Sequence, residues 1–255
     1  MMEANLTEQA KERQLDSMEI YPVLRKAILD LYVCPGTELS IRNLCEYYHA
    51  GRSPVRDAVM RLQQEGLVTI LPQRGIMVSL IDLDIEAQER YMRLAVETAV
   101  TRDFAVRHTT DQLREAERLL QQQVDWLQHG EGDYRSFLDL DDAFHEYFYV
   151  AMGQDFCFRT MQQSGGFYRR MRLLCCQVQQ MSLNLEQHGL ILQAVRTGDA
   201  DGVARALSNH LQKLDYEEKE LQEKYPYMFK GTQIRASAQH LGVDFLRAVY
   251  GGQKG

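Results

Sequence analysis

Four polar residues in the second half of the chain, Asp141, His145, His188 and His210, are of the types that bind transition metals. Asp141 and His145 are four positions apart, so a helix would present both on the same face. His188 and His210 lie in two later segments of helical periodicity, and side chains from facing helices meet inside a helix bundle. Imidazole and carboxylate together suit Zn²⁺, Ni²⁺, Mn²⁺ or Fe²⁺, and the pattern does not choose among these ions. The alternative is that each histidine is a satisfied or solvent-facing residue.

Arginines near the start of a predicted helix form a second candidate site, suited to DNA. A guanidinium at the beginning of such a helix can bind guanine O6 and N7 through two parallel hydrogen bonds. An arginine beside a glycine in a turn can reach phosphate or the minor groove. Taken singly, each of these arginines is more readily a solvated surface charge. The candidates for contact with DNA are Arg42, Arg52, Ser53, Arg56, Arg74 and Gly75.

Three predicted helices and a hairpin position the arginines. Apolar residues recur at helical spacing over 20–31 and over 40–50, where Ser40 can cap the second helix. Ser53 followed by Pro54 predicts the start of the third helix, as a capping hydroxyl and then proline at the first helical position. Strands are expected at 67–71 and 76–81, joined by 72–75. This order is that of a winged helix-turn-helix, which presents its third helix to the major groove of DNA.

The third helix is expected to have one apolar and one polar face. Val55, Val59 and Leu62 share the face that would pack on the core, so Arg56 should point away from it. Gly66 suits a left-handed residue after the end of the helix.

From residue 82 onward the periodicity is helical, with segments at 85–107, 111–128, 134–152, 156–181, 183–196 and 199–224. Short breaks between long helices favour an antiparallel bundle. We therefore expect a mainly α protein with a flexible lead-in at 1–18, a winged helix-turn-helix at 19–81, an all-α antiparallel bundle at 84–224 and an extension at 225–255.

Composition narrows the class of protein. The chain has 255 residues, 45% of them hydrophobic, and a formal net charge of −7, so any basic surface must be local. Residues 41–80 hold five arginines against three carboxylates, a local charge of +2. Five cysteines without a CxxC pair indicate free thiols in a reducing compartment. The N-terminus lacks the apolar core of a signal peptide, and no apolar run is long enough to cross a membrane, so we expect a cytoplasmic protein.

Residues 27–79 closely resemble the N-terminal domain of the GntR family of bacterial regulators. The resemblance rests on RSPVRDAV (52–59), EGLV (65–68) and PQRG (72–75) with the hydrophobic residues that follow. It implies that Arg42, Arg52 and Arg56 contact operator DNA and that the wing tip at Gly75 approaches the minor groove. The chain departs from the family at Ile41, where an acidic residue is usual, and at the turn 49–51, which usually reads Gly-Val-Ser.

Residues 84–224 resemble the FCD ligand-binding domain of the FadR branch of that family, through LDLDDAFHEYFYVAMG (138–153) and the segment 186–211. The resemblance implies a metal held by Asp141, His145, His188 and His210, and a small organic acid that binds the ion through its carboxylate. Arg93, in an R-x-x-x-E pattern with Glu97, could anchor that effector or could instead make an ordinary i,i+4 salt bridge. Another pocket residue could be among the arginines 169, 170 and 172.

We accordingly expect a transcription regulator, most often a repressor in this family, that binds double-stranded operator DNA as a homodimer and is not an enzyme. Two readings compete with a metal-dependent effector site. An Asp/His₃ site with open positions could activate water, as in a metal-dependent hydrolase. A purely structural metal is the other reading, with regulation by different means.

Overall fold

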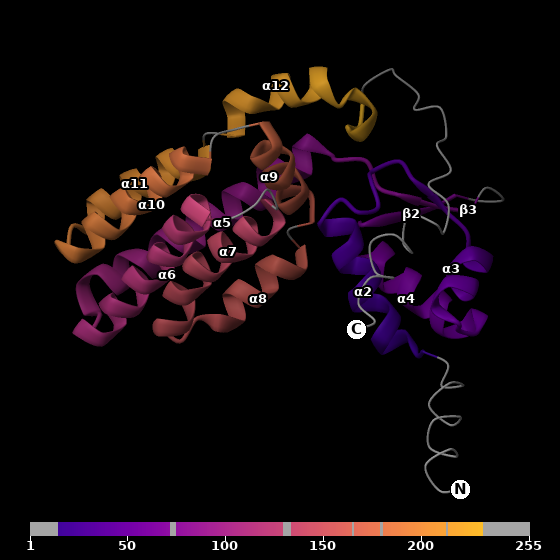
Figure 1. Cartoon of the computed structure of the whole chain (residues 1–255), viewed down its shortest axis with the longest axis horizontal. Helices are drawn as coiled ribbons and strands as arrows, with labels where there is room; N and C mark the ends of the chain where they lie inside the picture. The colour runs from indigo at the N-terminus through magenta and orange to yellow at the C-terminus, as the bar shows by residue number, and fades with distance from the viewer. Residues whose placement is uncertain are drawn as a thin grey trace, which may run out of the picture. The chain divides into compact units, whose positions relative to one another are not determined.

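The computed structural model describes residues 15–71, 75–129, 134–164, 166–178, 181–212 and 214–231, without the side chains of 177, 178 and 214–217. The chain forms two compact units that divide between Leu80 and Ile81 (Figure 1). The predicted mainly α fold is confirmed, with the strands confined to the first unit among the described residues.

The first unit contains three helices and a small sheet. Its elements in order are α2 (Ser17–Leu29), β1 (Glu38–Leu39), α3 (Ile41–Tyr48), α4 (Arg52–Gln64), β2 (Val68–Leu71) and β3 (Gly75–Val78). The sheet is antiparallel with strand order β1-β3-β2, and Ile70 pairs with Ile76 in the hairpin. The short strand β1 was not predicted, because two residues carry no readable alternation of apolar and polar side chains.

Local side-chain bonds define where the first helices begin. Asp16 caps α2 in a capping box with Glu19, and the Ser40 hydroxyl accepts the Asn43 N–H at 3.1 Å at the start of α3. The prediction that Ser53 caps α4 is wrong, because the helix begins at Arg52 after Gly51 and has no side-chain cap. Pro54 is consequently the third helical residue, where its missing N–H still costs nothing because the first four N–H groups have no partner in the helix.

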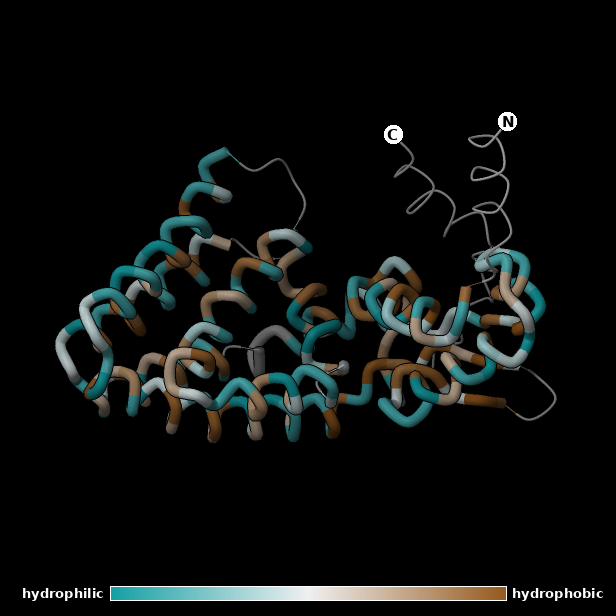
Figure 2. The backbone as a smooth tube through the Cα atoms, turned by 90° about the horizontal axis from the view of Figure 1, so that it is seen from below, coloured by the Kyte–Doolittle hydropathy of each residue, from teal (hydrophilic) through white to brown (hydrophobic). Residues whose placement is uncertain are grey.

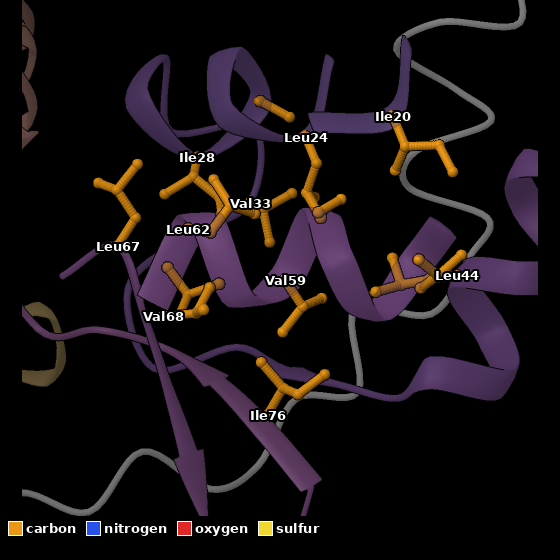
Figure 3. Close-up of a cluster of buried hydrophobic side chains, with 14 of the residues drawn as sticks. Ile20, Leu24, Ile28, Val33, Leu44, Val59, Leu62, Leu67, Val68 and Ile76 are labelled. Atoms are coloured by element: carbon orange, nitrogen blue, oxygen red, sulfur yellow. The ribbon is translucent and has the colours of Figure 1, made fainter. Parts of the chain in front are cut away.

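The core of this unit lies between α2, α4 and the hairpin. Ile20, Leu24 and Ile28 project from α2 toward Val59 and Leu62 of α4, with residues of the hairpin closing the other side (Figure 3). Val55, Val59 and Leu62 are each at most 2% exposed, while Arg56 is exposed, as predicted. Arg52 and Arg56 of α4 are therefore exposed to solvent, away from the core.

The second unit is a bundle of helices, α5 (Leu83–Arg107), α6 (Thr110–His129), α7 (Tyr134–Ala151), α8 (Asp155–Ser164), α9 (Gly166–Val178), α10 (Met181–Arg196), α11 (Ala200–Gln212) and α12 (Leu214–Lys224), followed by the turn η1 (Pro226–Met228). The single helix expected at 156–181 is wrong, because the segment forms α8 and α9. Two glycines, poor helix formers, stand at 165 and 166. The expected helix at 199–224 is likewise two elements, α11 and α12. No Gly or Pro stands at 210–215, so the sequence there gave no stop signal.

The helices of this unit carry both hydrophilic and hydrophobic residues, which alternate along the backbone in Figure 2. Phe148 meets Phe104 and Phe144 with ring centroids 5.1 Å apart in edge-on geometry. This aromatic cluster joins α5 to α7 and lies beside the polar centre described below. No described helix is both long enough and apolar enough to cross a membrane.

Candidate metal centre and nucleic-acid interface

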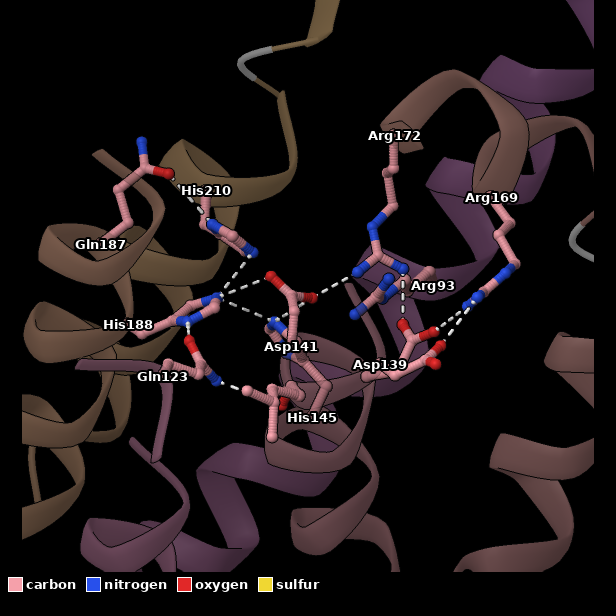
Figure 4. Close-up of polar contacts among 12 residues, drawn as sticks. Arg93, Gln123, Asp139, Asp141, His145, Arg169, Arg172, Gln187, His188 and His210 are labelled. Atoms are coloured by element: carbon pink, nitrogen blue, oxygen red, sulfur yellow. Dashed lines mark hydrogen bonds and ion pairs between the residues drawn. The ribbon is translucent and has the colours of Figure 1, made fainter. Parts of the chain in front are cut away.

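Three helices bring the predicted metal ligands together in the interior of the bundle. Asp141 and His145 project from α7, His188 from α10 and His210 from α11, toward one point (Figure 4). All four residues are buried, and one ligand atom of each lies within 4.8 Å of the others. The four residues that the sequence singled out therefore form one cluster.

Each imidazole is oriented by an oxygen acceptor at Nδ1. His145 donates to the Glu97 carboxylate, His188 to Gln123 Oε1 at 2.7 Å, and His210 to Gln187 Oε1. Gln123 is itself fixed because its amide N–H donates to the Leu140 carbonyl. A proton held on Nδ1 leaves the lone pair on Nε2, which is the atom that faces the centre. Such partners of ligating histidines set both the tautomer and the ring orientation.

The spacing of the inward atoms fits a transition metal. The Nε2 atom of His188 lies 3.2 Å from that of His145 and 3.3 Å from that of His210, and 3.4 Å from Asp141 Oδ1. An ion with bonds of ~2.0–2.1 Å places neighbouring ligand atoms about 3.3–3.4 Å apart in tetrahedral geometry and about 2.8–3.0 Å apart in octahedral geometry. Three lone pairs and a carboxylate at these separations repel one another, and a cation would compensate them. The residues present thus fit the metal that the sequence predicted.

An arginine holds the aspartate ligand on its other side. Arg172 of α9 pairs with Asp141 and, at 2.6 Å, with Asp142. Arg169 pairs with Asp142 and Asp139 at the edge of this network (Figure 4). Burial by itself would raise the pKa of Asp141, but the pKa is held well below its usual range, and the charge of Arg172 is the largest of the effects that lower it. Asp141 is accordingly ionised, which is its ligand form.

Arg93 makes the salt bridge that was one of its two predicted roles. Its Nε donates to Glu97 at 3.0 Å, the i,i+4 bridge, and Glu97 in turn holds His145. One terminal nitrogen of Arg93 is buried without a hydrogen-bond partner among the described residues. The guanidinium therefore has a donor left for a further acceptor.

A pocket opens beside the metal cluster, between α5, α8 and α9. Three arginines and one carboxyl group line it, together with apolar residues that include Met92, Phe158 and Met161. The arginines are Arg93, Arg169 and Arg172, and the carboxyl group is that of Glu89. Arg93 and Arg172 also touch partners or ligands of the cluster, so the pocket and the cluster share two guanidiniums. The third arginine of the run is different. Arg170 is fully buried and donates to the Gly166 carbonyl of its own helix.

The predicted DNA-contacting residues lie on the surface of the first unit. Arg52, Ser53 and Arg56 are exposed at the start of α4, and Arg42 is exposed on α3, where it pairs with Glu46 at 2.9 Å. Gly75 begins β3 with φ +107°, and a Cβ there would approach the Leu39 carbonyl to 3.3 Å. This position requires glycine for both reasons. Arg74 lies outside the described residues.

Sequence reasoning missed the outer partners of the cluster. Glu97 carried a signal through its R-x-x-x-E spacing, but it was interpreted only as a partner of Arg93. Gln123 and Gln187 carried none, because a glutamine on a helix is usually a surface residue. Arg172 was one of three adjacent candidates, and only the packing of α9 on α7 selects it.

Comparison with known families accounts for both units. Residues 17–78 match the family described as bacterial regulatory proteins, gntR family, and residues 90–213 match the FCD domain. The HTH-type transcriptional repressor RspR of Escherichia coli K12 is 31% identical over 199 residues, which are 78% of this chain and 86% of that protein. A regulator encoded in an unstable DNA locus of Streptomyces ambofaciens is 31% identical over 200 residues, 76% of this chain and 80% of that protein.

Solved structures agree in fold. Escherichia coli McbR/YncC superposes with a TM-score of 0.66 at 17% identity, covering 82% of this chain and 98% of that one. A GntR regulator from Rhodococcus sp. RHA1 gives 0.60 at 20% identity, with the same coverage. The exposed arginines of a winged helix, the bundle with its Asp/His₃ cluster and these matches lead to one conclusion: the chain belongs to the GntR family and is a DNA-binding transcription regulator with a C-terminal FCD domain.

Proposed function

We propose that this regulator is a repressor whose binding to operator DNA responds to a small carboxylate held at a divalent transition metal in the FCD domain. The observation that carries the proposal is the set of three Nε2 atoms and one carboxylate that face one another, each imidazole tied at Nδ1 to an oxygen acceptor. Zn²⁺, Ni²⁺, Mn²⁺ and Fe²⁺ all suit this donor set. The name repressor belongs to the relative RspR and supports the sign of regulation proposed here.

The effector class follows from the metal and its neighbouring arginines. Four protein ligands leave open positions on an octahedral ion, and a carboxylate oxygen would fill one. The free donor of Arg93 supports a second contact to the same carboxylate, since guanidinium binds carboxylates in a charge-assisted manner. Metal-bound water could also serve hydrolysis, but the relatives that match 76–78% of this chain are named as a transcriptional repressor and a transcriptional regulator.

We also propose that the residues that contact DNA are Arg42, Arg52, Ser53, Arg56, Arg74 and Gly75. We expect two copies of the chain to act together on a palindromic operator, because one recognition helix makes few base contacts.

Elemental analysis of the purified protein tests the metal site. We expect about one transition ion per chain in the wild type, most of which is lost in His188→Ala and His210→Ala. His129→Ala is the control, because His129 is exposed at the end of α6. Equal metal content in all four proteins would falsify the site.

A thermal-shift panel of small carboxylates tests the effector, because a ligand that binds only the native state raises its stability. The panel is run on metal-loaded and on chelator-treated wild type, and on Arg93→Met. Stabilisation that requires both the metal and Arg93 is expected. A carboxylate that stabilises the metal-free protein equally would mean that the metal has only a structural role.

A further inference from the structure

The chain continues beyond the FCD match, which ends at residue 213. Residues 214–230, comprising α12, η1, Phe229 and Lys230, are called the C-terminal strap below. We propose that the strap transmits occupancy of the metal centre to the connector 79–82, through which the chain passes from the DNA-binding domain into the FCD domain. The inference rests on the proposed metal site, whose regulation it concerns.

The strap starts at the metal centre. Helix α12 begins at Leu214, four residues after the ligand His210 on α11. It packs against α9, the helix that carries Arg172, and its Leu221 is 1% exposed. The strap is therefore attached to the cluster twice, through the chain to one ligand and through packing to the arginine that holds another.

An ion pair ties the middle of the strap to the first FCD helix. Glu218 of α12 lies 3.8 Å from Arg90 of α5, which also pairs with Glu86 at 3.4 Å. Arg90 is one turn before Arg93 on the same helix, and both are at most 8% exposed. A shift of α5 at Arg93 would thus also move Arg90 and its partner Glu218 in the strap.

The strap ends on the connector. Ile81 and Phe229 form a parallel bridge, in which the Ile81 N–H donates to the Met228 carbonyl at 2.8 Å and the Lys230 N–H donates to the Ile81 carbonyl at 2.9 Å. Ile81 is 0% and Phe229 1% exposed. Lys230 also pairs with Asp82 at 2.6 Å. Asp82 in turn accepts the Asp84 N–H and so caps α5.

These contacts make a continuous path from a metal ligand to the point where the two domains join in sequence. Binding can bias such an element only when the ligand favours one of its arrangements over the other. A metal that draws α7, α10 and α11 together orders the helix from which the strap starts. We therefore expect loading of the centre to stabilise the bridge between Ile81 and Phe229.

Hydrogen exchange of backbone amides measures that bridge directly. Zn²⁺ alone is the probe, and exchange over 79–86 is compared between zinc-loaded and chelator-treated full-length protein. In the wild type we expect loading to slow exchange there by about fivefold or more, the lower end of typical coupling between sites. In Phe229→Ala the connector should no longer respond, although zinc still binds. Tyr227→Ala is the matched control, since Tyr227 is an aromatic residue of the same turn that is 40% exposed, and it should respond like the wild type.

The outcomes separate the two proposals. Zinc that fails to bind the wild type would refute the metal site and the strap together. Zinc that binds without changing exchange at 79–86, or a response that survives in Phe229→Ala, would refute the strap alone. Should Phe229→Ala unfold, Lys230→Ala tests the same link from an exposed side chain, and an unreduced response in that variant would overturn the inference.

Discussion

The two domains of this regulator both have apolar cores, but they differ in how many polar side chains they bury. The DNA-binding domain has an apolar core, and the arginines proposed to contact DNA, Arg42, Arg52 and Arg56, are exposed. Among the described residues, Asp30 and Thr37 are its only buried polar side chains. The FCD domain buries histidines, carboxylates, arginines and a glutamine at its centre. We therefore expect substitutions of the exposed arginines in the first domain to change DNA binding without changing stability. In the FCD domain, metal binding and stability depend on the same buried residues.

The largest effect is expected where the buried network loses a charge. Arg172→Met should lower the free energy of unfolding of the FCD domain by about 3–5 kcal/mol, because the buried Asp141 loses its arginine partner and Asp142 keeps only Arg169. Urea unfolding of metal-free protein measures this. Arg159→Met is the control, since Arg159 is paired with Asp155 but is 63% exposed. Similar losses in both variants would mean that burial does not distinguish the two ion pairs.

Gln123 is not one of the proposed metal ligands, but it orients one of them, His188. Gln123→Ala should weaken metal binding about 10–100-fold, because His188 loses the acceptor that keeps its Nε2 lone pair directed inward. Competition with a chelator of known affinity measures the effect. Gln121→Ala removes an exposed glutamine from the same helix and should leave the affinity unchanged. Equal affinities in the two variants would mean that the hydrogen bond between His188 and Gln123 does not contribute to metal binding.

In the DNA-binding domain, substitution of the exposed arginines should change the affinity for DNA but not the free energy of unfolding. Arg52→Ala and Arg56→Ala should each weaken operator binding by about 1–3 kcal/mol and relax base preference. Their free energies of unfolding should stay within about 0.5 kcal/mol of wild type, because both side chains are exposed. Titrations at one fixed salt concentration, with Arg107→Ala as an exposed control in the other domain, provide the check. If both variants bound operator DNA with wild-type affinity, α4 would not be the helix that contacts the bases.

The smallest expected effect is a difference in stability between variants of Ser40 and Ser53, the two serines that the sequence predicted to be helix caps. Ser40→Ala should cost about 1 kcal/mol of stability, because its hydroxyl caps α3. Ser53→Ala should cost less than about 0.5 kcal/mol, since α4 has no side-chain cap. Thermal unfolding of the two variants compares them. A larger loss of stability in Ser53→Ala than in Ser40→Ala would mean that Ser53 caps α4, as the sequence predicted.

Local signals in the sequence predicted much of the fold. The cap at Ser40 and the apolar face of α4 follow from contacts within a few residues, and the structure has both. The same kind of signal failed at Ser53-Pro54, where Gly51 and the preceding turn place the helix start earlier. Periodicity also continued across the α8–α9 and α11–α12 junctions, because an apolar stripe does not record where a helix changes direction.

The sequence by itself determined the ligand types of the candidate metal site and the face that Asp141 shares with His145, because residue chemistry and helix periodicity are local properties. Only the tertiary structure decided that His188 and His210 join them. It also decided that Glu97, Gln123 and Gln187 orient the rings, that Arg172 rather than Arg170 holds Asp141, and that the strap closes on Ile81. These choices depend on which helices pack side by side and at what rotation, and residues 20–150 positions apart in the chain meet only through that packing.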